Sequence, residues 1–135
     1  MTSVFADTSA LIAVGNKDDA FHDKAVRVQK DLFKSKWPIV TTHGVFMELF
    51  NTFSRAQQKP IAIRLFNLIS RSKQWECIPT DGLIISGIGL FEKRADKDWS
   101  LVDCISMLVA QERGITEIFT TDHHFEQAGF TILLK

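Results

Sequence analysis

The stretch Ser3-Val4-Phe5-Ala6-Asp7-Thr8-Ser9-Ala10-Leu11-Ile12 decides the fold class of this chain. Residues 3–6 form an apolar run that is too short for a helix and is typical of a buried strand. Asp7 follows this run directly, and Thr8 or Ser9 can cap a short helix over residues 10–13. The stretch therefore predicts a strand that passes at once into a helix, with an acid at the junction.

The remainder of the chain repeats this alternation. Further strands are predicted over residues 38–41, 76–79, 117–120 and 131–134. Between them, apolar spacing and capping residues predict helices over residues 20–34, 42–53, 60–71, 80–91 and 100–114, with a turn at 15–19, a polar loop at 95–99 and a short helix after Asp122. This pattern indicates an α/β fold with a central, mostly parallel sheet of four or five strands. Gly82, Gly87 and Gly89 weaken the helix over 80–91, and we interpret them as points of close packing against the sheet.

Composition limits the possible functions. The 135 residues include 45% hydrophobic residues, which is typical of a globular protein, and we expect one domain over residues 1–135. Sixteen basic and sixteen acidic residues give a net charge near zero, so nothing attracts nucleic acid globally and any such binding requires a local site.

Other features indicate a cytoplasmic protein. Cys77 and Cys104 lack the spacing of a metal site and are expected to be buried free thiols in a reducing compartment. The first residues lack the basic start and apolar run of a signal peptide, and no apolar stretch approaches the roughly 20 residues of a membrane helix.

Four acids lie just after predicted strands or within the first two turns of predicted helices. Asp7 and Asp122 follow strands, Asp103 lies in the first turn of a helix, and Glu48 lies about two turns into another. Since sites in α/β sheets form at the carboxyl ends of the strands, the four carboxylates could meet. Each also has an ordinary explanation: Asp7 as a helix cap, Asp103 as the partner of Ser100 in a capping box, Asp122 in a turn, and Glu48 as a solvated residue.

Four motifs surround these acids: Val4–Ile12 around Asp7, Thr41–Leu49 around Glu48, Asp98–Ser106 around Asp103, and Phe119–Phe125 around Asp122. Together they resemble the motifs of PIN-domain nucleases. The resemblance runs from Ser3 to the C-terminus, in the order and spacing of the family, and all four acids are present.

The resemblance implies a three-layer α/β/α fold and metal-dependent cleavage of RNA, and it is strongest to the toxins of VapBC toxin–antitoxin pairs. It implies Mg²⁺ or Mn²⁺ as the cofactor, because carboxylates suit hard ions that activate water and neutralise charge on a phosphate. The catalytic residues would be Asp7, Glu48, Asp103 and Asp122, with Asp7 and Asp103 as the firmest metal ligands and Asp98 as a candidate fifth acid. Ser100 and Thr120 would orient carboxylates or water through hydrogen bonds. The expected partners are RNA, a cognate antitoxin and a second copy in a homodimer.

Several alternatives remain open. The chain could be an RNA-processing PIN nuclease, or a PIN domain that binds RNA or protein without catalysis. A phosphatase of the haloacid-dehalogenase type would need a second Asp where Ser9 stands, and the acidic pair and late lysine of a receiver domain are not found. No role is assigned to His22, His43, His123 and His124, which helix-start, loop or cap positions explain as well as RNA contact. The group Phe46, Phe50, Phe53 and Phe66 is expected in the core, and any exposed part would mark a dimer or antitoxin groove.

Overall fold

The computed structural model describes residues 2–135 and contains one five-stranded parallel sheet. Its strands are β1 (Val4–Ala6), β2 (Ile39–Thr42), β3 (Trp75–Ile78), β4 (Glu117–Phe119) and β5 (Thr131–Ile132). They lie in the order β3-β2-β1-β4-β5, and every neighbouring pair is parallel. The chain therefore builds outward from β1 first on one side and then on the other. The strand order reverses between β1 and β4, which is where α/β proteins form their sites.

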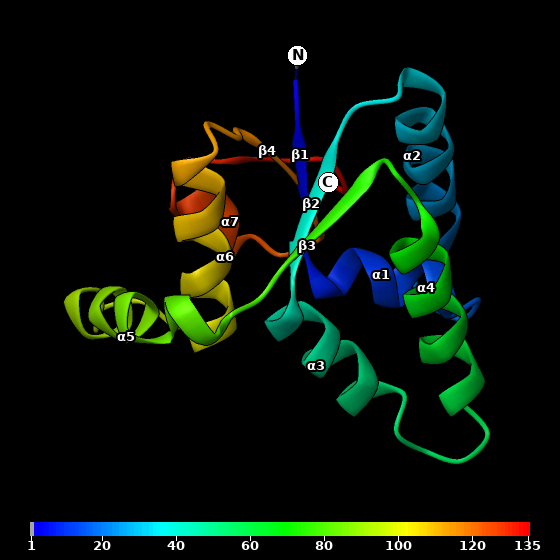
Figure 1. Cartoon of the computed structure of the whole chain (residues 1–135), viewed down its shortest axis with the longest axis horizontal. Helices are drawn as coiled ribbons and strands as arrows, with labels where there is room; N and C mark the ends of the chain where they lie inside the picture. The colour runs from blue at the N-terminus through cyan, green and yellow to red at the C-terminus, as the bar shows by residue number, and fades with distance from the viewer. Residues whose placement is uncertain (1) are drawn as a thin grey trace.

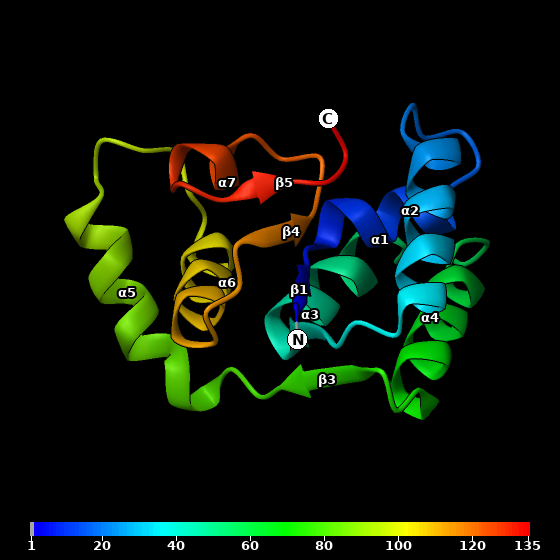
Figure 2. The same cartoon turned by 90° about the horizontal axis from the view of Figure 1, so that it is seen from above.

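Helices cover both faces of this sheet. They are α1 (Thr8–Gly15), α2 (His22–Ser35), α3 (His43–Thr52), α4 (Lys59–Arg71), α5 (Ile84–Lys93), α6 (Leu101–Glu112) and α7 (His124–Gln127). Figures 1 and 2 show α2 and α4 on one side of the sheet and α5, α6 and α7 on the other. The predicted three-layer α/β/α architecture with a five-stranded sheet is confirmed. No helix within residues 2–135 is both long enough and apolar enough to cross a membrane.

Burial on both faces explains why β1 is continuously apolar. Val4 belongs to the same buried cluster as Leu32 of α2, whereas Phe5 belongs to the cluster that contains Ile105 of α6. Successive strand residues point to opposite faces, so a strand covered on both sides needs apolar residues at every position. Asp7 is the first polar residue after this strand, and it lies at the carboxyl end of the sheet.

Two helix starts that were predicted from capping residues differ from the structure. The helix predicted over residues 10–13 begins at Thr8, and Asp7 is its N-cap residue, in extended conformation and without a side-chain capping bond. Ser9 cannot cap, because its hydroxyl group contacts Asp7 and accepts the N–H of Thr121. The helix predicted from Thr80 begins as a 3₁₀ turn over Asp81–Leu83 before α5.

The turn predicted at 15–19 also begins later, since α1 includes Gly15. A Cβ atom at Gly15 would lie 2.7 Å from Cγ2 of Ile61, so a glycine permits α1 to approach α4 closely.

The prediction that Gly82, Gly87 and Gly89 pack against the sheet was wrong. Of these three, only Gly87 packs tightly, and its neighbours are Leu101 and Ile105 of α6, not the sheet.

Two predicted caps are confirmed. The N–H of Val45 donates to Oγ1 of Thr42 at 3.3 Å, and Ser100 and Asp103 form a complete capping box. Among the cysteines, Cys104 is buried as expected, but Cys77 is only half-buried, because it lies on β3, an edge strand of the sheet. Both thiols are free.

Candidate active site

An open hollow of about 510 Å³ lies at the carboxyl end of the sheet, where the strand order reverses. It is lined by Asp7, Thr8, Ser9, Ile12, Glu48, Asn51, Thr52, Asp98, Ser100, Asp103, Asp122 and His124. The structure thus brings together all four acids singled out in the sequence, together with Asp98 and Ser100. Thr120 is fully buried and lies beneath the hollow, in contact with Asp7.

Asp7 is the most deeply placed of these acids. Its residue is only 3% exposed, and its Oδ2 accepts hydrogen bonds from the hydroxyl groups of Thr120 at 2.8 Å and Ser9 at 3.2 Å. Burial raises the pKa of Asp7 to about 7, the Thr120 hydrogen bond opposes this rise, and the nearby Asp103 and Glu48 carboxylates add to it. Asp7 is therefore a carboxylate that a cation would stabilise.

Glu48 is held at the hollow by a contact between two helices. The Thr42 cap sets the start of α3, so Glu48 projects toward α1. There its Oε1 accepts a 2.6 Å hydrogen bond from the hydroxyl of Thr8. Partial burial raises the pKa of Glu48, the Thr8 bond lowers it, and the charges of Asp103 and Asp122 raise it further.

Asp103 is both a member of the capping box of α6 and one of the acids that line the hollow. Its Oδ2 accepts the backbone N–H of Ser100 at 3.1 Å, and its own N–H donates to Oγ of Ser100 at 3.0 Å. This capping box holds the carboxylate at the start of α6, while the same side chain lines the hollow. Ser100, the N-cap residue of α6, thus orients the Asp103 carboxylate through its backbone N–H.

Asp122 is positioned by the turn after β4. Its backbone N–H donates to Oγ1 of Thr120 at 3.0 Å, and its Oδ1 accepts the N–H of His124 at 2.9 Å. Asp98 lies at the exposed rim of the hollow. The acids therefore form a buried part, at Asp7 and Asp103, and a more open part, at Asp122 and Asp98.

His124 is a residue of the hollow to which the sequence assigned no role. Its Nδ1 lies 3.2 Å from Oδ2 of Asp103 and 3.3 Å from Oδ1 of Asp122. The available signal was its position two residues after Asp122, at the start of a short helix. His22 lies elsewhere, with its Nδ1 2.7 Å from the carbonyl oxygen of Ala13. His43 and His123 are exposed.

The donor chemistry of the hollow fits a hard divalent cation. Each of the four carboxylates has one oxygen held by hydroxyl or backbone donors: Oδ2 of Asp7, Oε1 of Glu48, Oδ2 of Asp103 and Oδ1 of Asp122. Within residues 2–135, no Lys or Arg forms an ion pair with any of them. Clustered carboxylates repel one another when ionised, and oxygen-rich sets of this kind are what Mg²⁺ and Mn²⁺ bind.

The fold and this acidic hollow together define a family. Residues 4–131 match the PIN domain, and the chain belongs to the PIN domain family. Within it, the chain is 28% identical over 141 residues to a protein of Mycobacterium tuberculosis (strain H37Rv) named 23S rRNA-specific endonuclease VapC20, with 94% of this chain and 95% of that protein covered.

Solved structures agree with this assignment. The crystal structure of M. tuberculosis VapC20, described as a sarcin–ricin loop cleaving toxin, has a TM-score of 0.82 and 27% identity, covering 96% of this chain and 97% of that one. FitAcB of Neisseria gonorrhoeae has a TM-score of 0.65, with 14% identity and coverages of 96% and 95%. VapBC2 of Rickettsia felis, bound to a DNA fragment from its promoter, has a TM-score of 0.70, with 14% identity and coverages of 97% and 97%. At 14% identity, the last two show the fold alone.

Proposed function

We propose that this chain is a metal-dependent ribonuclease that hydrolyses RNA phosphodiester bonds and serves as the toxin of a toxin–antitoxin pair. The observation that carries this proposal is the convergence of four carboxylates, from four separate segments, on one open hollow without a Lys or Arg partner within residues 2–135. The likeness to VapC20 over nearly the whole of both chains supports RNA as the substrate.

In this proposal Asp7, Glu48, Asp103 and Asp122 hold Mg²⁺ or Mn²⁺, and Asp98 is a candidate fifth ligand at the rim. When bound, such an ion would activate water and neutralise charge that develops on the scissile phosphate. The hydroxyl groups of Thr120 and Thr8 hold Asp7 and Glu48 by one oxygen each, which leaves their other oxygens for the ion.

The openness of the hollow suits a polymeric substrate. Asn51 and Thr52 of α3 line its wall beside Glu48. The amide of Asn51 can donate to phosphate oxygens, and such contacts position a nucleic-acid backbone without reading its sequence. The near-zero net charge of the chain means that local contacts of this kind must supply the affinity.

The direct test is cleavage of a defined RNA by the purified chain. A short RNA with the sarcin–ricin loop of 23S rRNA is the first substrate to use, because the similar protein VapC20 cleaves that loop. We expect cleavage with Mg²⁺ or Mn²⁺ and none with EDTA. Failure to cleave this RNA or total RNA with either ion would contradict the proposal and favour a PIN domain that only binds.

We also propose that a cognate antitoxin covers the apolar surface of α3 and α4. Of the phenylalanine group, Phe46 and Phe53 are buried, whereas Phe50 and Phe66 are 38% and 40% exposed. Met47, Ile63 and Leu68 on the same two helices are also exposed. An apolar surface of this kind is typical of a protein interface.

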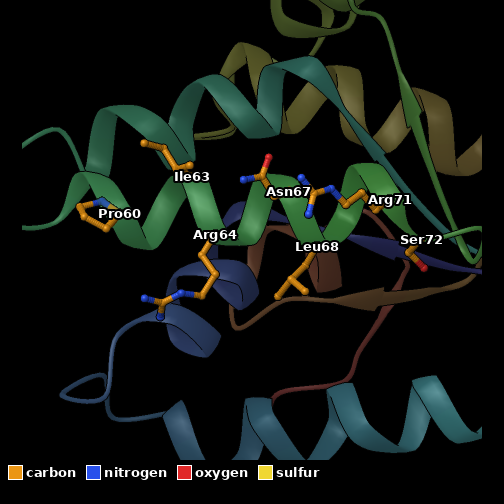
Figure 3. A pocket seen from close by; sticks show the side chains of 7 residues that line it. All are labelled: Pro60, Ile63, Arg64, Asn67, Leu68, Arg71 and Ser72. Carbon is orange, nitrogen blue, oxygen red and sulfur yellow. The ribbon is translucent and has the colours of Figure 1, made fainter.

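Figure 3 shows side chains of α4, including Ile63 and Leu68 from this surface. A hollow of about 560 Å³ there is lined by Pro60, Ile63, Arg64, Asn67, Leu68, Arg71 and Ser72. Apolar side chains beside two guanidinium groups fit a partner segment that carries both apolar and acidic residues.

Co-expression with a small protein encoded next to this chain tests the antitoxin. We expect the two proteins to co-purify. We also expect expression of this chain in the host cytoplasm to arrest growth, and co-expression of the partner to relieve that arrest. No growth effect and no such neighbour would favour an RNA-processing role.

Sedimentation of the chain alone tests the expected homodimer.

A further inference from the structure

The imidazole ring of His124 shares the hollow with two of the proposed metal ligands. Its Nδ1 lies 3.2 Å from Oδ2 of Asp103 and 3.3 Å from Oδ1 of Asp122, and one donor atom from each of the three residues lies within 4.8 Å of the others. Neighbouring ligand atoms around an octahedral ion stand about 3 Å apart. One ion can therefore contact all three residues with small adjustments of their side chains.

The fold holds this ring in place. His124 begins α7, and its backbone N–H donates to Oδ1 of Asp122 at 2.9 Å. The next residue, Phe125, is fully buried and anchors the turn in the core. The His124 side chain is 21% exposed, whereas that of His123 is 71% exposed, with its Nδ1 3.9 Å from Oδ1 of Asp122. Of two adjacent histidines, only one faces both acids.

Nδ1 of His124 lies within hydrogen-bond distance of Oδ2 of Asp103, at 3.2 Å, and a bound ion would take the place of that contact. A single Nδ1–H bond points well at only one acceptor, yet Nδ1 is nearly equidistant from two carboxylate oxygens. Both oxygens already accept a backbone N–H, from Ser100 and from His124 itself. An ion among the three atoms would contact each of them.

We propose that Nδ1 of His124 is a direct ligand of a divalent ion held with Asp103 and Asp122, and that this nitrogen makes the site prefer Mn²⁺ to Mg²⁺. The inference rests on the metal-binding part of the proposed function. Both ions favour carboxylate and water oxygen, but Mn²⁺, as a first-row transition metal, accepts an imidazole nitrogen more readily than the harder Mg²⁺ does. Nitrogen at one position of an otherwise oxygen-donor site therefore discriminates between the two ions.

Pulsed electron paramagnetic resonance of the purified full chain loaded with Mn²⁺ tests the bond itself. Directly bound ¹⁴N modulates the electron spin echo of Mn²⁺. We expect this modulation in the original protein and in His123→Ala, the matched control, and its loss in His124→Ala. Absence of the modulation in the original protein, or its persistence in His124→Ala, would overturn the assignment. The spectrum of the original protein decides the matter even if His124→Ala does not fold.

Calorimetric titration with each ion tests the preference. In His124→Ala we expect the Mn²⁺ affinity to fall about tenfold or more, while the Mg²⁺ affinity changes less than about threefold. An equal loss for both ions would mean that His124 only positions the carboxylates, and the proposed preference would be wrong. No loss for either ion would also overturn it.

These measurements separate the inference from the proposed function. If the spectrum shows bound nitrogen but no RNA is cleaved, the His124 proposal stands and the ribonuclease proposal is wrong. If RNA cleavage depends on the metal but no nitrogen is bound, the ribonuclease proposal stands and the His124 proposal is wrong.

Discussion

The hydroxyl of Thr120 donates a 2.8 Å hydrogen bond to Oδ2 of Asp7 and thereby joins the carboxyl ends of β4 and β1. The same hydroxyl oxygen accepts the N–H of Asp122 at 3.0 Å. One buried side chain thus positions two of the four proposed ligands across the point where the strand order reverses. The contact also opposes the effect of burial on the pKa of Asp7.

Thr120→Val tests this contact. Valine retains the shape but leaves the N–H of Asp122 without its acceptor and removes one of the two hydroxyl groups, those of Thr120 and Ser9, that donate to Oδ2 of Asp7. We expect the free energy of unfolding to fall by about 1–3 kcal/mol in urea denaturation and RNA cleavage to slow about tenfold or more. Thr120→Ser, which retains the hydroxyl, should lose much less of both. Equal losses in the two variants would show that the hydroxyl does not matter.

Replacing proposed ligands should separate catalysis from folding. Asp7→Asn and Asp103→Asn remove charge but retain an oxygen that can accept the bonds from Thr120 and Ser100. We therefore expect cleavage to become undetectable in both variants, while circular dichroism and cooperative unfolding persist. Mg²⁺-dependent cleavage retained in both would overturn the assignment of these two residues.

The pKa of Asp7 predicts a pH dependence of stability in EDTA. Because burial raises this pKa from 3.8 to about 7, the protonated form stabilises the folded state. This contribution is complete below about pH 4 and is lost as the pH rises through about 7. At pH 8, Asp7→Asn should be more stable than the original protein by on the order of 2–4 kcal/mol, and the difference should vanish near pH 4. Thermal unfolding at several pH values measures it, and a lower stability of Asp7→Asn throughout would contradict this sign.

Saturating Mg²⁺ or Mn²⁺ should narrow that difference in stability at pH 8. An ion that binds only the folded state raises its stability by mass action, by about 2.7 kcal/mol at a concentration 100 times the dissociation constant. Asp7→Asn should gain less, because it has lost a ligand. The melting temperature of each protein with the ion and with EDTA gives the comparison, and equal gains would argue against Asp7 as a ligand.

Two glycines of α5 should respond in opposite ways to alanine. A Cβ atom at Gly87 would lie 2.6 Å from Cγ1 of Ile105, so Gly87→Ala forces α5 away from α6 and should cost about 1–3 kcal/mol. Gly89 has no atom within 4 Å of such a Cβ, so Gly89→Ala should stabilise the helix by up to about 1 kcal/mol. Urea denaturation of both variants checks the signs. The same sign in both would mean that the α5–α6 contact is not as close as described.

The local parts of the fold were predictable from neighbouring residues. The Thr42 cap and the Ser100–Asp103 capping box involve residues three apart or fewer, so the sequence pattern is sufficient. The start of α1 was placed too late because Ser9, a good capping residue, uses its hydroxyl for Thr121, 112 residues away. The packing of Gly87 was assigned to the sheet for a similar reason, since its neighbour Ile105 lies on another helix.

The sequence by itself determined the alternation of strands and helices and the location of Asp7 and Asp122 just after two strands, because apolar periodicity and capping act over a few residues. Only the tertiary structure decided the burial that raises the pKa of Asp7, the oxygen of each carboxylate that is held, and the approach of His124 to Asp103. These properties depend on contacts between residues as many as 113 positions apart, which arise only when β4 pairs with β1.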